Sequence, residues 1–104
     1  MRVVALSTLR DFWEKPEYED SKGALDAWYR EVKQAEWVSP ADIKAQYGNA
    51  SILKGGRVVF NIAGNKYRLI VSINFITQVV FIKFIGTHNQ YDKINAETYD
   101  EFAD

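Results

Sequence analysis

A chain of 104 residues with 47% hydrophobic residues can bury a core without disulfide or metal cross-links, and we expect residues 1–104 to form one domain. The absence of cysteine and the presence of one histidine exclude disulfide frameworks, thiolate metal centres and histidine-rich zinc sites. No stretch approaches the roughly 20 apolar residues of a membrane span, and the apolar start is too short for a signal peptide. We therefore expect a cytoplasmic protein with no membrane partner and no cofactor.

The net charge of −1 hides a segregated distribution. Residues 57–93 carry five basic residues against Asp92 alone, whereas residues 94–104 carry four acidic residues and no basic one. A basic surface is therefore compatible with a chain that is slightly acidic overall. The acidic tail could fold over that surface, mimic a nucleic-acid backbone or stay solvated, and the sequence does not decide among these.

Apolar residues at helical spacing predict two helices in the first half of the chain, over Ser7–Lys15 and Ser21–Glu36, each with its first serine as the cap. Ser39 followed by proline opens a third, short helix that ends near residues 47–48. Residues 2–5 could add an edge strand. Residues 49–56 are interpreted as a flexible polar connection.

After residue 56 the apolar period changes to two, which is typical of strands. Strands over residues 57–63 and 66–75 are joined by Gly64-Asn65, a pair suited to a two-residue hairpin turn. In this register Asn61 lies opposite Arg68. One face of the hairpin is then core, namely Val58, Phe60, Ile62, Tyr67, Leu69, Val71, Ile73 and Phe75. The other face is mixed and basic, namely Arg57, Val59, Asn61, Lys66, Arg68, Ile70 and Ser72.

A third strand is predicted over Val79–Ile85 and a short terminal helix over Ala96–Phe102. Lys83 interrupts the apolar run of the third strand, either to bind phosphate or to guard an edge against aggregation. We expect an α+β fold with a small antiparallel sheet of three to four strands. Two or three N-terminal helices should pack on one face and leave the opposite face open.

The strand over 79–85 is followed by Gly86-Thr87-His88-Asn89-Gln90-Tyr91-Asp92-Lys93, which we interpret as a short polar loop at the rim of the sheet. Together with the hairpin Arg57–Ile70, this run resembles the HigB toxins of bacterial toxin–antitoxin modules. Those toxins belong to the RelE-like group of messenger-RNA endonucleases. The resemblance is strongest over residues 54–94.

The resemblance implies a RelE-like fold and a metal-independent endonuclease that cleaves mRNA, usually during translation on the ribosome. It also implies a cognate antitoxin that covers the basic face or the site and bears a helix-turn-helix DNA-binding domain. RelE-like toxins are typically strongly basic. A net charge of −1 therefore predicts weaker binding to ribosomal RNA by counterion release.

The residues can be assigned to such a reaction because RNA supplies its own nucleophile, the 2′-hydroxyl. The enzyme then needs a base, an acid and cations, but no metal. Histidine exchanges protons near neutral pH, so His88 is assigned as general acid, with general base as the alternative. Arg68 would hold the scissile phosphate. Tyr91 could stack on a base or donate to the phosphate, and Asp92 could orient His88 or Lys93. The remaining substrate-binding candidates are Lys54, Arg57, Asn61, Lys66, Lys83 and Lys93.

Arg68 has a second interpretation, as a solvated strand residue or as a partner for an acidic helix. The function also has an alternative, because a non-catalytic RNA- or protein-binding module could keep the same fold without the chemistry.

Overall fold

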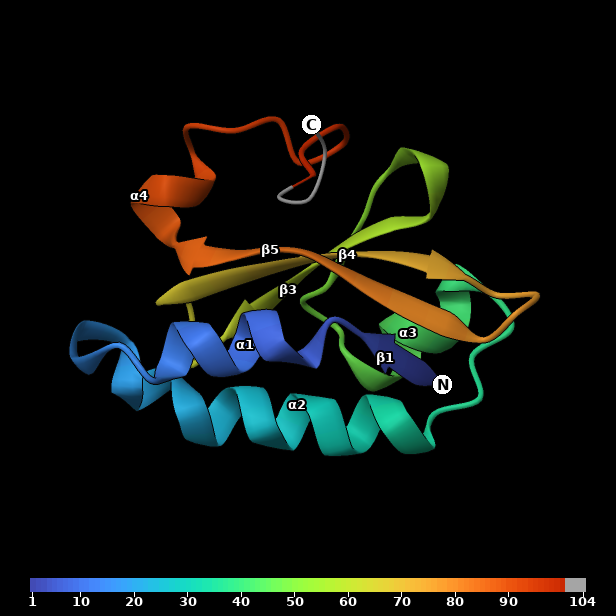
Figure 1. Ribbon diagram of the computed structural model, residues 1–104. Coiled ribbons are helices and arrows are strands. Elements are labelled where there is room, and N and C mark those ends of the chain that lie inside the picture. The colour runs from blue at the N-terminus through green and yellow to red at the C-terminus, as the bar shows by residue number, and fades with distance from the viewer. Residues whose placement is uncertain (101–104) are drawn as a thin grey trace.

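A five-stranded mixed sheet forms the middle layer of the structure, a computed structural model that describes residues 1–100 (Figure 1). The strand order is β1-β5-β4-β3-β2, with β1 parallel to β5 and all other neighbours antiparallel. The strands are β1 (Arg2–Val4), β2 (Ser51–Ile52), β3 (Arg57–Ile62), β4 (Tyr67–Asn74) and β5 (Val79–Thr87).

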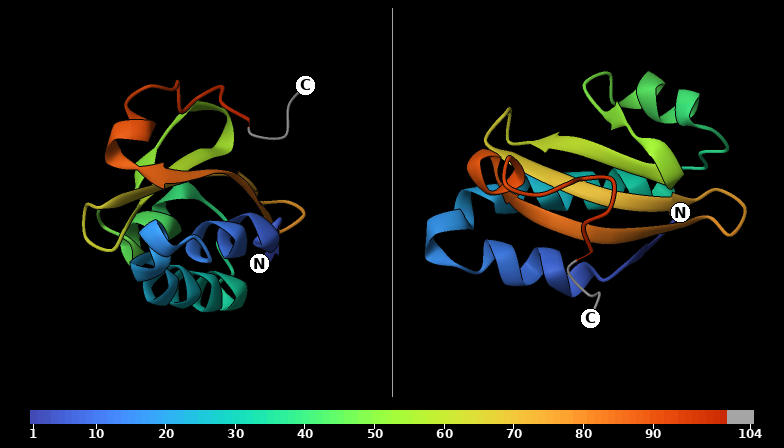
Figure 2. Two further views of the ribbon diagram at one scale, coloured as in Figure 1. Left: turned by 60° about the vertical axis from the view of Figure 1, so that its left-hand side comes forward. Right: turned by 90° about the horizontal axis from the view of Figure 1, so that it is seen from above.

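Helices α1 and α2 lie along one face of the sheet, whereas α4 and the chain after it lie over the other face (Figures 1 and 2). The helices are α1 (Leu6–Trp13), α2 (Lys22–Gln34), α3 (Pro40–Gln46) and α4 (His88–Tyr91), with 3₁₀ turns η1 (Pro16–Ser21) and η2 (Lys54–Gly56). No helix in the described part of the chain is long and apolar enough to cross a membrane.

The α+β class is confirmed, but the sheet has more strands than predicted and is not purely antiparallel. The edge strand expected near residues 2–5 exists and pairs parallel to β5. The segment 49–56, predicted to be a flexible connection, contains β2 and η2. Because β2 has only two residues and both are exposed, it leaves no periodic pattern in the sequence.

The three predicted N-terminal helices are present, with differences at their caps. Ser7 lies inside α1, whose cap position is occupied by Ala5. Ser21 does precede α2, yet its hydroxyl donates to the Tyr18 carbonyl at 2.6 Å instead of capping the helix. Serine hydroxyls satisfy several local backbone groups, so the residue type alone did not fix its partner.

The predicted hairpin register is confirmed, since Asn61 pairs with Arg68 and Arg57 pairs with Ser72. The connection has four residues instead of two, because the ladder ends at Ile62 and Tyr67. Ala63 and Gly64 both adopt positive φ, and this left-handed backbone takes Ala63 out of the ladder.

The helix-facing side of the sheet carries the main core, as the register predicts. All eight predicted core positions pack there: Val58, Phe60, Ile62, Tyr67, Leu69, Val71 and Ile73 are buried and Phe75 is partly buried. Leu9 from α1, Leu25 from α2 and Ile43 from α3 are fully buried against this face. Burying so many large apolar side chains is the main source of stability for the sheet.

The opposite face is not open, which corrects the prediction. Its centre is the buried set Val59, Ile70 and Phe84, covered by side chains from α4 and the segment after it, namely Tyr91, Ile94, Ala96 and Tyr99. We call residues 94–100 the C-terminal strap. The part of the predicted helix over Ala96–Phe102 that the structure describes is not helical, and residues 101 and 102 lie outside the described residues. An irregular chain reaches across more strands than a helix of equal length.

The β3–β4 hairpin is fastened to η1 by a carboxylate. Asp20 accepts hydrogen bonds from the Lys66 ammonium group and from the Tyr67 hydroxyl. These bonds, that from Lys66 first, lower the pKa of Asp20. Burial and the bond to Asp20 raise the pKa of Tyr67 to about 12.

We expect Asp20→Asn to destabilise the protein at neutral pH and to matter less in acid. Since the pKa of Asp20 is lower in the folded state than its ordinary value of 3.8, the ionised carboxylate stabilises the fold above that value. This contribution is lost as the pH falls through the lowered pKa. Urea unfolding should therefore show the gap between wild type and Asp20→Asn closing between about pH 5 and about pH 2. The exposed neighbour Glu19, changed to Gln, serves as the control, and a gap that stays constant with pH would contradict the assignment.

Candidate active site

His88 is the first residue of α4 and follows directly on β5. Thr87 and Gln90 form a capping box: the Thr87 hydroxyl accepts from the Gln90 N–H at 3.2 Å, and the Gln90 side-chain oxygen accepts from the Thr87 N–H at 2.9 Å. The His88 N–H donates to the Lys66 carbonyl at 3.3 Å. The backbone that carries His88 is therefore held from both sides, and the segment is a helical turn instead of the predicted loop. The Thr-x-x-Gln spacing was the signal for it.

The imidazole of His88 is half exposed and lies beside the carboxylate of Asp92. The distance from Nδ1 to Oδ2 is 3.2 Å, and the two side chains are 53% and 56% exposed. The two residues are four apart, so the turn of α4 and its cap bring them together. No hydrogen bond within residues 1–100 uses Nε2, which leaves this nitrogen for a substrate.

Arg68 lies at the centre of a row of three directly paired residues, Asn61, Arg68 and Gly86, on β3, β4 and β5. We call this set the rim row. Arg68 shares its face of the sheet with Ile70, so it lies on the side where α4 stands. Its Nη1 donates to the carbonyls of Asn65 at 3.0 Å and Tyr67 at 3.3 Å. No carboxylate within residues 1–100 pairs with Arg68. The interpretation that Arg68 is a partner for an acidic helix is therefore wrong.

Gly86 leaves the space beside Arg68 free of a side chain and keeps the start of α4 close to β5. A Cβ atom at Gly86 would stand 2.5 Å from Phe84 Cζ and 2.6 Å from the Gln90 side-chain oxygen. Both distances are too short for contact, so glycine is required by packing here. The rim row and His88 thus occupy the same end of the same sheet face.

The remaining predicted residues divide into those near this end and those away from it. Lys66 is at this end, but its ammonium group is paired with Asp20 of η1. Tyr91 is half-buried, with its ring packed against the Val59 set. Lys54 is exposed in η2, before the start of β3 and thus at the opposite end of that strand from Asn61.

Arg57 and Lys83 are held by the C-terminal strap. Arg57 Nη1 donates to the carbonyls of Tyr99 and, at 3.4 Å, of Ala96. Lys83 Nζ lies 2.9 Å from the Asp100 carboxylate, with side chains only 19% and 26% exposed. Lys83 sits at an irregularity of β5, where Ile70 pairs with Phe84 but Val71 pairs with Ile82. This bulge explains the lysine in an apolar run, because it turns the side chain toward the strap.

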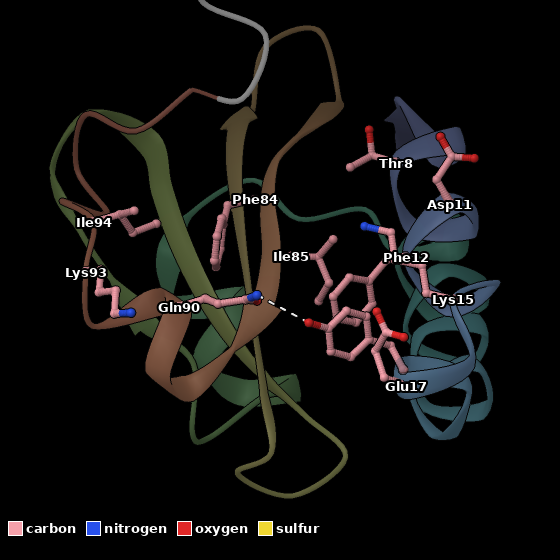
Figure 3. Close-up of a pocket in the computed structure, with 11 residues that line it drawn as sticks. Thr8, Asp11, Phe12, Lys15, Glu17, Phe84, Ile85, Gln90, Lys93 and Ile94 are labelled. Atoms are coloured by element: carbon pink, nitrogen blue, oxygen red, sulfur yellow. Dashed lines mark hydrogen bonds between the residues drawn. The ribbon is translucent and has the colours of Figure 1, made fainter.

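A cavity of about 610 Å³ that the sequence did not indicate lies between α1 and η1 on one side and the β5–α4 junction on the other (Figure 3). Lys93 and Gln90 line it, and Gln90 Nε2 reaches across it to the Tyr18 hydroxyl at 3.3 Å. This hydrogen bond links α4 to η1, while His88 is not among the residues that line the cavity. A second cavity, of about 380 Å³, includes Asn61 in its lining.

Within residues 1–100, no three His, Asp or Glu side chains gather in a way that could hold a metal ion.

Comparison with known proteins identifies relatives of this chain. A family model described as HigB_toxin, RelE-like toxic component of a toxin–antitoxin system, matches residues 21–94, which include the rim row and His88. The chain is 30% identical over 79 residues to the mRNA interferase HigB of Escherichia coli O6:H1, covering 74% of this chain and 77% of the relative. It is 28% identical over 98 residues to the mRNA interferase toxin HigB of Escherichia coli K12, covering 92% of each chain.

We expect Gly86→Ala to lower the free energy of unfolding by about 1–3 kcal/mol, because the new methyl group must displace the buried Phe84 ring or the Gln90 cap. Gly23→Ala in α2 is the control, since its Cβ would meet nothing within 4 Å. Urea denaturation measures both, and the control should be unchanged or slightly more stable. Equal stability of Gly86→Ala and wild type would contradict the packing at the junction.

Proposed function

The chain belongs to the HigB toxin family of RelE-like toxins, and on this basis we propose that it is the toxin of a type II toxin–antitoxin module that cleaves mRNA. Both relatives named above are called mRNA interferases, which supports endoribonuclease activity for this chain. We further propose that residues 1–104 act as one RelE-like domain. The whole reaction can then be assigned to the end of the sheet where β5 meets α4.

The observation that carries the proposal is the placement of Arg68 and His88. Arg68 pairs directly with Gly86, two residues before His88, and the carbonyl of Lys66 accepts the N–H of His88. A guanidinium without a carboxylate partner and an exposed imidazole therefore share one end of one sheet face. Such a pair supplies the positive charge and the proton transfer that cleavage of a phosphodiester requires.

We assign Arg68 to the scissile phosphate and His88 to the leaving group. Solvent water takes the proton of the 2′-hydroxyl of the RNA as its oxygen attacks phosphorus, the bond from phosphorus to the 5′-oxygen breaks, and a 2′,3′-cyclic phosphate remains. Arg68 stabilises the negative charge that develops on the phosphorus oxygens, with the fork geometry that suits phosphate. His88 Nε2 gives the 5′-oxygen its proton, while Asp92 holds Nδ1 and stabilises the charged imidazole. General base catalysis by His88 is the alternative assignment.

Tyr91, Asn61 and Lys93 complete the proposed substrate contacts. The ring of Tyr91 is packed against the sheet, so we assign its hydroxyl to hydrogen bonding with the phosphate in preference to stacking on a base. Asn61 stands beside Arg68 and can bind a sugar or base edge with its amide. Lys93 is exposed two residues after α4 ends and can approach the backbone of the RNA.

We also propose that the ribosome presents the mRNA to this site in the cytoplasm. Three of the five cations in residues 57–93 are engaged within the chain: Lys66 by Asp20, Lys83 by Asp100 and Arg57 by strap carbonyls. Few cations remain to neutralise phosphates, so affinity for free RNA should be low. The family implies a cognate antitoxin, and we propose that it carries a helix-turn-helix DNA-binding domain.

His88→Gln should lower the single-turnover cleavage rate by about 10²–10⁴-fold, which is the usual contribution of a positioned acid or base. Expression of the variant should no longer arrest growth, while antitoxin binding stays intact. Asn89→Ala is the matched control, because Asn89 is the next exposed residue of the same turn. Undiminished cleavage by His88→Gln would exclude this mechanism, and wild-type expression without growth arrest would favour the non-catalytic module.

Cleavage is expected to continue in EDTA and to leave 2′,3′-cyclic phosphate ends, because the 2′-hydroxyl is the nucleophile in the proposed reaction. End-group analysis of the RNA fragments by mass spectrometry distinguishes these products from 3′-hydroxyl ends. Strict dependence on magnesium, or fragments with 3′-hydroxyl ends, would contradict the assignment.

A further inference from the structure

The C-terminal strap makes contacts with the sheet face that resemble those expected of RNA. Arg57 binds two carbonyl oxygens of the strap, and Lys83 binds the carboxylate of Asp100. The ring of Tyr99 meets Phe84 edge-on, with centroids 5.3 Å apart. A single strand of RNA makes the same two kinds of contact with a protein. Its phosphate oxygens bind cations, and its base rings pack against aromatic side chains.

These contacts continue the proposed active site along the same face. Arg57 is four residues from Asn61 on β3, so it lies about 13 Å along the sheet from the rim row. Between them lies the buried row of Val59, Ile70 and Phe84, which the strap and Tyr91 cover. An RNA strand that runs from the rim row along the sheet would therefore meet the strap next.

Beyond the apolar packing of Ile94, Ala96 and Tyr99, the strap is attached by few polar interactions. It has no helix or strand within residues 94–100, and hydrogen bonds from Arg57 and Lys83 hold it to the sheet. Segments of this kind open at low free energy compared with the core of a sheet. The strap also carries Glu97 and Asp100 and no basic residue, so its departure would remove negative charge from a face that must bind RNA.

We propose that Arg57 and Lys83 form a second phosphate-binding subsite, filled by the C-terminal strap in the free protein and taken over by the RNA strand when it binds. This inference rests on the proposed function and adds a regulated step to it. The strap competes with RNA for the two cations, so the free toxin binds RNA less tightly than its sheet face allows. The rim row and His88 lie outside the strap and are not blocked by it.

The test compares Asp100→Asn with Glu97→Gln in the full chain. Each variant removes one negative charge from the strap, but Asp100 pairs with Lys83, whereas Glu97 is exposed and its carboxylate makes no ion pair within residues 1–100. The probe is a fluorescent single-stranded RNA oligonucleotide with 2′-O-methyl groups, which cannot be cleaved. Fluorescence anisotropy at several salt concentrations gives the affinity and its salt dependence.

Asp100→Asn should bind the oligonucleotide about two- to fivefold more tightly than wild type, the change expected from freeing one paired cation. Its slope of log affinity against log salt should steepen by about 0.7, because one more phosphate is neutralised. Glu97→Gln should change both quantities less. Lys83→Gln should abolish the additional effect of Asp100→Asn, since the two substitutions act through one contact.

Equal affinities of Asp100→Asn and Glu97→Gln for the oligonucleotide would overturn the proposed subsite. The change in affinity would then come from the overall charge of the chain and not from the contact with Lys83. The proposed function would survive that result if wild type still cleaves mRNA. Hydrogen exchange gives a second readout that does not depend on any variant: amides of residues 95–100 should exchange faster when the oligonucleotide is bound. Faster exchange with the antitoxin but not with RNA would also overturn the proposal.

Discussion

The pairing of β4 with β5 is the constraint on which the proposed site depends. It sets Arg68 beside Gly86 and brings the Lys66 carbonyl to the N–H of His88. One ladder therefore places a guanidinium and an imidazole at the same end of the sheet, although they are 20 residues apart in the chain. Gly86 lets α4 fold back close to β5, and the capping box of Thr87 and Gln90 fixes the first turn of that helix. Strands hold such groups more firmly than loops do.

The slight negative charge of the chain becomes understandable once the partners of the cations are known. Three of the five basic residues in 57–93 are used inside the molecule: Lys66 fastens the hairpin to η1, and Arg57 and Lys83 fasten the strap. Arg68 is the exception at the rim, because no carboxylate within residues 1–100 neutralises it. A toxin organised in this way would depend on orientation by a partner more than on attraction to RNA in general. Control of the sheet face by the strap would then add to control by an antitoxin.

Much of this could be predicted from the sequence where a pattern is periodic and local. The hairpin register followed from alternation, because a one-residue slip would expose Tyr67 and Leu69. The strap could not be predicted in the same way, since Ile94, Ala96 and Tyr99 follow no regular period and their partners are distant in sequence. The bulge at Lys83 and the partner of each cation are tertiary features for the same reason. The Thr-x-x-Gln spacing of the capping box, in contrast, is present in the sequence and indicates the helical turn that the structure has in place of the predicted loop.

The most direct test of the central claim is an NMR titration with a 2′-O-methyl dinucleotide, because the single histidine gives one imidazole signal and Arg68 can be assigned by substitution. If His88 and Arg68 bind the same phosphodiester, their side-chain resonances will shift together and give the same dissociation constant. A shift of one without the other, or two different dissociation constants, would contradict the shared site.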